Sequence, residues 1–259
     1  MMSELYLMRW PHNLSAVYVN GATIQYSQDQ SVFYANEVLS PGQTICTWSS
    51  VTDYLASGNP PSLPLLKINK TYELSLRLKA DNDLPVQVQI DFFDSHQEVL
   101  DSYRGTDSRL KFKVPKGTIS YEVRLVNLKH EWLRFESLTI GEIGVVERIF
   151  EVTSRPHYDW VHVRPLRESN RKTVRLIINQ GPRSILPVSI HERCDVEQIF
   201  IYTDGQAIDS LIQSLSQLHF KHEAKLSLEA GLGYYHLPGE FMVKFKAGLK
   251  QIQKLGGKK

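Results

Sequence analysis

Apolar and polar residues alternate over much of residues 1–140. The clearest alternating stretches are residues 72–78, 86–92, 110–114 and 121–125. Successive side chains of a β-strand point to opposite faces, so this period of two predicts strands that are apolar on one face and polar on the other. Such strands are typical of antiparallel sheets that enclose a core and face water outside.

Two interruptions of the alternation predict local features of these sheets. Residues 94–97, Asp-Ser-His-Gln, separate two alternating runs and predict a hairpin turn. Between residues 133 and 140 the alternation slips by one position at Glu136 and Ser137, as it would at a β-bulge. Eight or nine short strands with no clear helix indicate an antiparallel β-sandwich of the jelly-roll type.

The pattern changes after residues 141–144, Gly-Glu-Ile-Gly. Residues 160–163, 174–178, 199–202 and 226–228 read as strands, and two stretches have a helical period. One apolar stripe is Ile208, Leu211, Ile212, Leu215 and Leu218, and the other is Phe241, Phe245, Leu249 and Ile252. We therefore expect a mainly β chain, with a β-sandwich over residues 1–145 and a small α/β module of unassigned role over residues 146–259.

Residues 48–66 follow neither period. Pro60, Pro61 and Pro64 each remove a backbone donor and push the preceding residue toward extended geometry. The stretch also contains Trp, Tyr and four Leu, which is more apolar surface than disordered linkers carry. Long irregular segments in folded domains are often functional, so we interpret this one as an ordered loop and as the main indication of function.

Composition and charge exclude several classes of protein. The 42% of hydrophobic and 22% of charged residues are those of a soluble globular protein, and no apolar run approaches the ~20 residues of a membrane helix. Because Glu4 stands where a signal peptide would be positive, a cytoplasmic location is expected. The net charge is −3 over residues 1–150 and +5 over residues 151–259, a difference that suits a chain of two modules. It is not the strongly basic face that nucleic-acid-binding proteins present.

The motifs of common enzymes and cofactor sites are not found. The sequence has no G-x-S-x-G elbow and no P-loop, and residues 231–233 lack the third glycine of a dinucleotide fingerprint. Cys46 and Cys194 share no metal-ligand spacing, and His157, His162 and the pair His219 and His222 lack further ligands nearby. We expect no metal, no cofactor and no enzymatic activity.

Asp204 is the strongest catalytic candidate, because it follows a predicted strand and precedes a predicted helix. A more ordinary interpretation is that Asp204 and Gly205 shape the turn and that Asp204 caps the helix.

Aromatic residues in the first half suggest a binding role. Sugars present flat C–H faces that stack on Trp or Tyr, while polar neighbours bind their hydroxyls. Trp48, Tyr54 and Asn59 in the long loop could form such a carbohydrate- or partner-binding surface, and Trp10, Tyr103 and Trp132 are weaker candidates. The more ordinary interpretation of Trp48, which we favour, is that it is a core aromatic of the sandwich, since large aromatics carry much of any small core.

Several strings of the first half resemble a known family, at compatible spacings over roughly residues 8–140. They are Tyr-Val-Asn-Gly-Ala-Thr-Ile-Gln at 18–25, Trp-Ser-Ser at 48–50 followed by Tyr54, Ala-Ser at 56–57, Pro-Ser-Leu-Pro at 61–64, Leu-Arg-Phe at 133–135 and Ser-Leu-Thr-Ile at 137–140. The family is the third accessory secretory protein of the accessory Sec system.

This resemblance implies a cytoplasmic, non-catalytic component of a Gram-positive export machine, with a β-domain similar to a carbohydrate-binding module. The implied partners are two other accessory secretory proteins (one glycosyltransferase-like and one esterase-like), a dedicated SecA-type motor ATPase, and the glycosylated serine-rich repeat adhesin that is exported. Membrane contact would be peripheral at most. The leading hypothesis is an adaptor subunit. Two alternatives are a stand-alone carbohydrate-binding module and, third, a small hydrolase or transferase on the α/β half.

Overall fold

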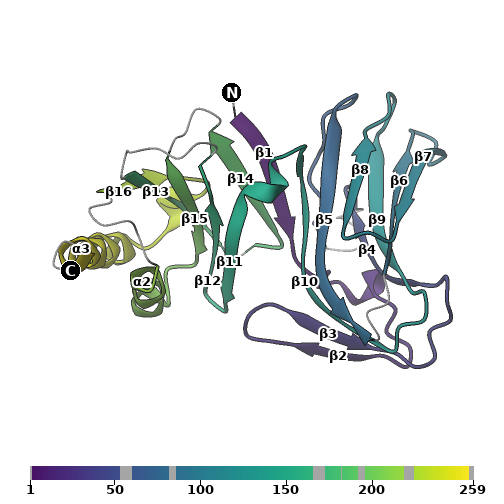
Figure 1. The fold of residues 1–259 in the computed structure, drawn as a ribbon, viewed down its shortest axis with the longest axis horizontal. Coiled ribbons are helices and arrows are strands. Elements are labelled where there is room, and N and C mark those ends of the chain that lie inside the picture. Colours follow the sequence, from purple (N-terminus) through teal and green to yellow (C-terminus); the bar gives the residue numbers. More distant parts are fainter. Residues whose placement is uncertain are drawn as a thin grey trace. The chain divides into compact units, whose positions relative to one another are not determined.

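Strands dominate the structure, as the period of two predicts. The computed structural model describes residues 2–52, 60–81, 86–165, 173–181, 183–191, 196–218 and 225–256. The chain divides into two units (Figure 1). The first unit comprises Glu4–Val146 and Ser184–Pro187, and the second comprises Met1–Ser3, Glu147–Arg183 and Val188–Lys259.

Within the described residues the strands form three sheets. The large sheet has the order β14-β1-β10-β3-β2, with β5 paired to β10 and β8 paired to β5. The small sheet has the order β4-β9-β6-β7, and the mixed sheet has the order β11-β12-β15-β13-β16.

The strands of the first two sheets are β1 (Met2–Met8), β2 (Thr23–Tyr26), β3 (Val32–Ala35), β4 (Thr44–Ser49), β5 (Thr71–Ala80), β6 (Gln87–Phe93), β7 (Val99–Gly105), β8 (Arg109–Lys113), β9 (Ser120–Val126), β10 (Trp132–Glu142) and β14 (Ile185–His191). A 3-10 helix, η1 (Leu14–Ala16), lies between β1 and β2. The mixed sheet contains β11 (Ile149–Arg155), β12 (Tyr158–Val163), β13 (Thr173–Gln180), β15 (Glu197–Thr203) and β16 (Lys225–Ala230).

The first unit is an antiparallel β-sandwich whose core lies between the large and small sheets. The alternate apolar residues of both sheets pack into one buried cluster. Trp10, Trp48 and Phe135 are at its centre, with ring centroids 5.4–6.4 Å apart. Each of the three is at most 1% exposed, so together they remove several hundred Å² of apolar surface from water.

The β-bulge predicted in the last strand of the sandwich is confirmed. The register of β10 against β5 shifts between Phe135 and Ser137, which leaves Glu136 as the extra residue. Because of this shift, Phe135 and Leu138 both point into the core and are fully buried, while Glu136 is exposed.

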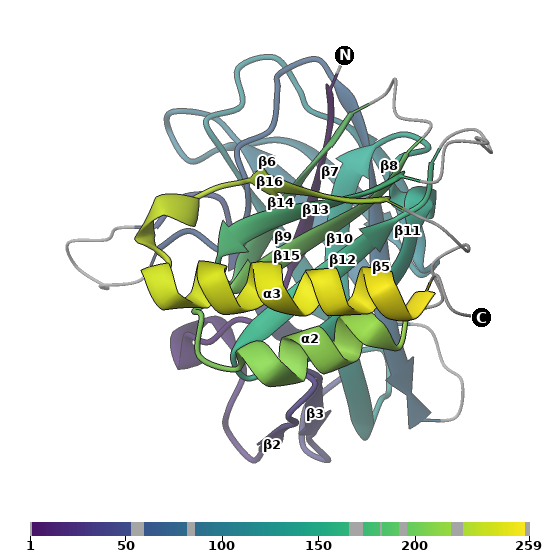
Figure 2. The same cartoon turned by 90° about the vertical axis from the view of Figure 1, so that its left-hand side faces the viewer.

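The second unit contains the mixed sheet and two helices, α2 (Ile208–Ser216) and α3 (Gly239–Gly256). β13 runs parallel to both β15 and β16, and α2 connects β15 to β16. The predicted apolar stripes of α2 and α3 pack on the sheet (Figure 2). A Cβ at Gly248 would lie 2.4 Å from Ile212 Cδ1, so a glycine there permits the close approach of the two helices.

The predicted fold class, an antiparallel sandwich followed by an α/β part, is confirmed. The hairpin at residues 94–97 connects β6 and β7, where Asp94 N donates to Glu98 O. Among the described residues the sandwich sequence forms ten strands, β1–β10, where eight or nine were expected. The extra strands include the short pair β2 and β3, which has only four residues in each strand.

We predict that Trp48→Ala lowers the free energy of unfolding by about 3–5 kcal/mol. The substitution leaves a cavity beside Trp10 and Phe135 and removes the hydrogen bond from Trp48 Nε1 to Arg9 O (2.8 Å). Urea unfolding followed by circular dichroism measures the loss. Trp132→Ala is the matched control, because Trp132 is 37% exposed and its removal costs about 1 kcal/mol or less. Equal losses for both variants would contradict this placement of the core.

Candidate functional site

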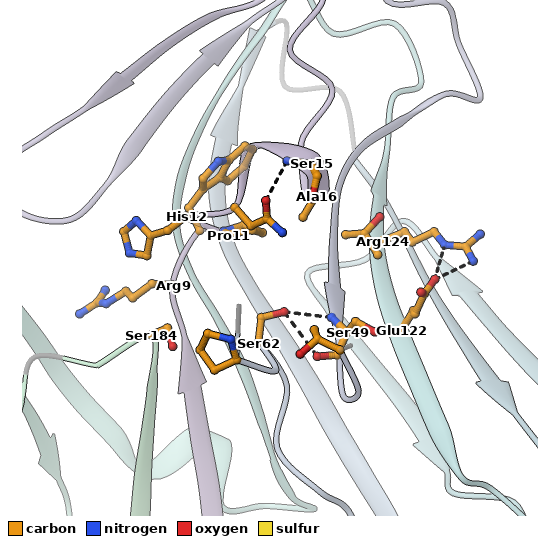
Figure 3. Close-up of a pocket in the computed structure, with 15 residues that line it drawn as sticks. Arg9, Pro11, His12, Ser15, Ala16, Ser49, Ser62, Glu122, Arg124 and Ser184 are labelled. Carbon is orange, nitrogen blue, oxygen red and sulfur yellow. Dashed lines mark hydrogen bonds and ion pairs between the residues drawn. The ribbon is translucent and has the colours of Figure 1, made fainter. Parts of the chain in front are cut away.

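A cavity of about 500 Å³ opens on the outer face of the small sheet (Figure 3). Its lining is rich in hydroxyl groups and contains rings and charged side chains. The lining residues are Arg9, Trp10, Pro11, His12, Asn13, Ser15, Ala16, Thr47, Ser49, Thr52, Pro60, Ser62, Glu122, Arg124 and Ser184. We call this cavity the sandwich pocket.

The floor of the sandwich pocket is formed by the outward positions of β4 and β9. Thr47 and Ser49 point outward from β4, because Trp48 between them is buried in the core. Glu122 and Arg124 do the same on β9, on either side of the buried Val123. β4 and β9 are paired, with Thr47 opposite Arg124 and Ser49 opposite Glu122. The floor is therefore polar because these strands alternate.

Arg124 is the centre of a charged network that extends from this floor. Its guanidinium lies 2.9 Å from Glu122 Oε2 and 3.3 Å from Asp91 Oδ2. Asp91 is only 3% exposed, and it also accepts hydrogen bonds from Gln89 Nε2 and Ser102 Oγ. A buried carboxylate is stable when it is paired and hydrogen-bonded in this way, so the network fixes the orientation of Arg124 at the floor.

The segment that carries residues 9–16 forms one wall of the pocket. Arg9 N donates to Ser184 O (3.1 Å), and Arg9 O accepts from the indole of Trp48 (2.8 Å). The short helix η1 begins after Asn13, whose side chain accepts from Ser15 N (3.0 Å). These bonds hold the wall at both of its ends.

Thr52, Pro60 and Ser62 of the long loop after β4 form another wall. Ser62 Oγ accepts from Ser49 N (2.9 Å), and Ser49 O accepts from the backbone N–H groups of Ser62 and Leu63. Tyr121 OH donates to Pro64 O (2.7 Å). Burial raises the pKa of Tyr121 well above its ordinary value, so this hydroxyl remains a neutral donor. The described part of the loop is thus fastened to the small sheet.

The structure corrects the expectation that Trp48 presents a stacking surface. Trp48 is fully buried and its Nε1 is bonded to Arg9 O, so no ring face is available to a sugar. It is the core aromatic that the favoured interpretation described. Tyr54 and Asn59 lie outside the described residues and stay predictions. Both fall in the segment between Thr52 and Pro60, which line the pocket.

The weaker aromatic candidates lie in three different places. Trp10 lines the sandwich pocket, although it is only 1% exposed. Tyr103 packs against Phe92 in the core and donates to Lys113 O (3.3 Å). Trp132 is 37% exposed and stacks on Phe33, away from the pocket lining. The structure therefore does not bring these aromatics together in one binding surface.

The expectation that His157 and His162 are isolated is wrong. His157 Nδ1 lies 2.9 Å from Asp204 Oδ2, and His162 forms a hydrogen bond with Glu197. Pairing of β12 with β15 brings these residues together across more than thirty positions of sequence. The single-sequence pattern gave no signal of this pairing. His219, His222 and Cys194 lie outside the described residues.

Asp204 shapes a turn, as one interpretation predicted. Its Oδ1 accepts from Gln206 N (2.8 Å), while its Oδ2 binds His157. The expectation that it caps the following helix is wrong, because the N-cap of α2 is Ala207, which makes no side-chain capping bond. The carboxylate of Asp204 is used to hold two turns together.

Other sources of chemistry contribute little. Cys46 is a free buried thiol, and its burial raises its pKa well above the ordinary value, which makes it unreactive. Among the described residues, no three His, Cys, Asp or Glu side chains gather in a way that could hold a metal ion. In the same part of the chain, no helix is both long and apolar enough to cross a membrane.

The sandwich pocket is arranged for binding. Its hydroxyls and the Glu122–Arg124 pair offer donors and acceptors to a polar ligand, and its proline and histidine side chains offer flat surfaces. Two of the lining hydroxyls also bond the backbone: Ser49 Oγ donates to Val51 O (2.9 Å), and Ser62 Oγ accepts from Ser49 N (2.9 Å).

Comparison with known proteins gives a family for this chain. Residues 17–142 match the family described as Accessory Sec secretory system ASP3. An accessory Sec system protein of the same family from Streptococcus gordonii is 31% identical over 126 residues, which are 49% of this chain and 79% of that relative. The chain belongs to this family. The matched residues lie in the first unit, which contains the sandwich pocket.

Solved structures also resemble this family member. A crystal structure of accessory secretory proteins 1, 2 and 3 in Streptococcus pneumoniae contains a chain that is 32% identical, with a TM-score of 0.50. The match covers 52% of this chain and 94% of the pneumococcal chain. A chain of the Glycosylation Associate Protein (Gap123) complex from Streptococcus agalactiae is 20% identical, with a TM-score of 0.51. The match covers 97% of this chain and 67% of that chain, and at this identity it shows the fold alone. Carbohydrate-binding modules align at TM-scores of 0.27–0.35, too distant a likeness to bear on function.

Sequence reasoning identified the loop beside the pocket but missed most of the pocket itself. Glu122 and Arg124 occupy outward positions of a strand, and any solvated strand has polar residues there. Arg9 and His12 lie in a short segment with no recognisable motif. The excess of hydroxyl residues around 47–52 and at Ser62 was a usable signal, since both stretches border the same loop.

We predict that Arg124→Gln lowers the free energy of unfolding by about 1–3 kcal/mol, because it leaves the buried Asp91 carboxylate without its cation. Thermal and urea unfolding measure the loss. Arg104→Gln serves as the control, because Arg104 is exposed and has no carboxylate within 4.0 Å among the described residues. The control should change stability by about 0.5 kcal/mol or less. A loss for Arg124→Gln no larger than that of the control would contradict the network.

Proposed function

We propose that the protein is a non-catalytic adaptor subunit of an accessory Sec export complex. The observation that carries this proposal is its 32% identity to a chain in the structure of accessory secretory proteins 1, 2 and 3, of which it covers 94%. Similar chains at this identity use similar surfaces, so the two other accessory secretory proteins are its direct partners. It acts in the cytoplasm, at most peripheral to the membrane.

The adaptor helps to recognise glycosylated serine-rich repeat adhesins and to deliver them to a dedicated SecA-type motor and channel. The sandwich pocket supports this role, because a lining of hydroxyl, amide, guanidinium and carboxylate groups suits a ligand rich in hydroxyls. The long loop supports it as well: Pro60, Pro61 and Pro64 stiffen the chain before binding, which lowers the entropy lost when an interface forms.

Co-expression with the two other accessory secretory proteins tests the adaptor role. We expect the three chains to co-purify at a fixed stoichiometry through size-exclusion chromatography, because each subunit of an obligate assembly buries a constant interface. A tagged unrelated β-sandwich of similar size controls for non-specific capture. The adaptor proposal would be contradicted if this protein eluted as a monomer, separate from both other accessory secretory proteins.

A stand-alone carbohydrate-binding module is the second candidate, and the polar floor at Glu122 and Arg124 favours it. This candidate predicts that the protein binds a sugar or glycopeptide without any partner. A titration of the free chain with such a ligand tests this candidate alone. A negative result would therefore reject the stand-alone module and leave the adaptor proposal standing.

We predict that Thr47→Trp weakens binding of an N-acetylglucosamine-modified serine-rich peptide at least about tenfold, or 1.4 kcal/mol. The indole would fill the sandwich pocket from its floor. Isothermal titration of the free protein and of the assembly measures the affinity. Thr23→Trp is the matched control, an exposed strand threonine outside the pocket lining, and it should leave affinity unchanged. Equal affinities for both variants would show that the ligand binds elsewhere.

A further inference from the structure

The outer face of the large sheet carries a group of cationic side chains that the functions above do not use. Three neighbouring strands of this sheet, β8, β5 and β10 (Figure 1), contain six exposed Lys and Arg residues. They are Arg77, Lys79, Arg109, Lys111, Lys113 and Arg134, which we call the cationic strip. Each is flanked along its strand by residues that point to the core, so all six share the outer face.

The strand register makes this strip continuous. Lys113, Lys111 and Arg109 lie opposite Thr71, Glu73 and Ser75 of β5. Arg77 and Lys79 follow along β5, and Arg134 of β10 lies opposite Lys79. Eight positions of β5 separate Thr71 from Lys79, which corresponds to about 26 Å at about 3.3 Å per residue.

Most of the strip has no counter-charge. Arg109 lies 3.8 Å from the buried Glu73, and Arg134 donates to the hydroxyls of Ser31 and Ser27 and interacts electrostatically with Asp29. Among the described residues, none of the other four cations has a carboxylate within 4.0 Å. A group of unpaired cations is unusual in this unit, because residues 4–146 contain 13 Lys and Arg against 16 Asp and Glu. Nearly half of these cations lie on one face of a unit whose net charge is negative.

Protection of a sheet edge does not account for the strip. Lysines on an edge strand prevent pairing with other chains, and this explanation fits β8, which pairs only with β5. It does not fit Arg77 and Lys79, because β5 lies between β8 and β10. Lys79 and Arg134 are like charges directly opposite each other, an arrangement that destabilises a sheet. Binding of an anionic partner would remove this repulsion.

One end of the strip has a flat apolar surface. Trp132 stacks on Phe33 with ring centroids 5.9 Å apart and planes at 26°. Phe33 lies opposite Arg134, so the aromatic pair continues the line of cations. At 37% exposure, the indole presents part of its surface to solvent while it lies along Phe33.

We propose that the cationic strip is a docking surface for an acidic segment of a partner protein. The segment is extended and about eight residues long, with carboxylates at alternate positions that face the cations. An apolar side chain at one end of it contacts Trp132 and Phe33. Attraction between the strip and the acidic segment replaces the repulsion among the cations in the free protein.

A protein segment fits this face better than an anionic membrane. Interfacial tryptophans that anchor proteins to bilayers insert their rings among the lipids. Trp132 lies flat against Phe33, and this stack offers a contact surface for a side chain instead of a group that inserts.

Binding of a fluorescein-labelled decaglutamate peptide to the full chain tests the proposal. We expect Arg77→Glu/Lys79→Glu to weaken binding at least about tenfold, measured by fluorescence anisotropy. Binding to the unchanged protein should also weaken when the salt concentration rises from 50 to 500 mM, because exposed charges are screened. A peptide of repeating Glu-Glu-Lys-Lys, which has no net charge on either face when extended, should bind neither form.

The matched control is Arg104→Glu/Lys246→Glu, which makes the same change of charge at exposed positions on β7 and α3. It should change affinity less than about twofold. Should the double reversal on β5 fail to fold, Lys111→Gln/Lys113→Gln removes charge from β8 only, and we expect it to weaken binding at least about threefold. The proposal is overturned if the control and the strip variants lose affinity equally. It is also overturned if the strip variants lose only co-sedimentation with phosphatidylglycerol vesicles.

Discussion

The buried indole of Trp48 is the constraint on which the rest of the sandwich depends. Its ring packs against Phe135 of the large sheet and against Trp10, and so connects the two sheets through aromatic contacts. Its Nε1 donates to Arg9 O, which ties the segment before η1 to β4. The wall of the sandwich pocket is therefore held by the same side chain that closes the core. A residue that looked like a ligand contact contributes to the site by positioning its wall.

The two halves of the period-two pattern have separate tasks. The inward residues of β4 and β9, such as Trp48 and Val123, are buried in the core. The outward residues of the same strands, Thr47 and Arg124 among them, form the floor of the pocket. Because the register is fixed by burial of the apolar half, the polar half is fixed as well. A one-residue slip would exchange the two sets and destroy core and floor together.

The sequence was sufficient for features that depend on local pattern and insufficient for those that depend on pairing. Periodicity predicted the strands, the bulge at Glu136, and the helical stripes, since burial imposes each of them along the chain. It did not predict the His157–Asp204 pair or the Arg124–Asp91 pair, because strand register brings those residues together from distant positions. The role of Trp48 was ambiguous for a different reason: sugar binding and core packing both favour large aromatics.

The sandwich has two outer faces with different electrostatic properties. On the small sheet, Arg124 is paired with both Glu122 and Asp91, so the pocket floor has directional polar groups and no free cation of Arg124. On the large sheet, Arg77 and Lys79 have no such partners among the described residues, so their charges are not neutralised within the unit. Because a filled core lies between the faces, occupation of one need not disturb the other. The adaptor proposed above needs this separation if it is to hold a cargo and a partner at once.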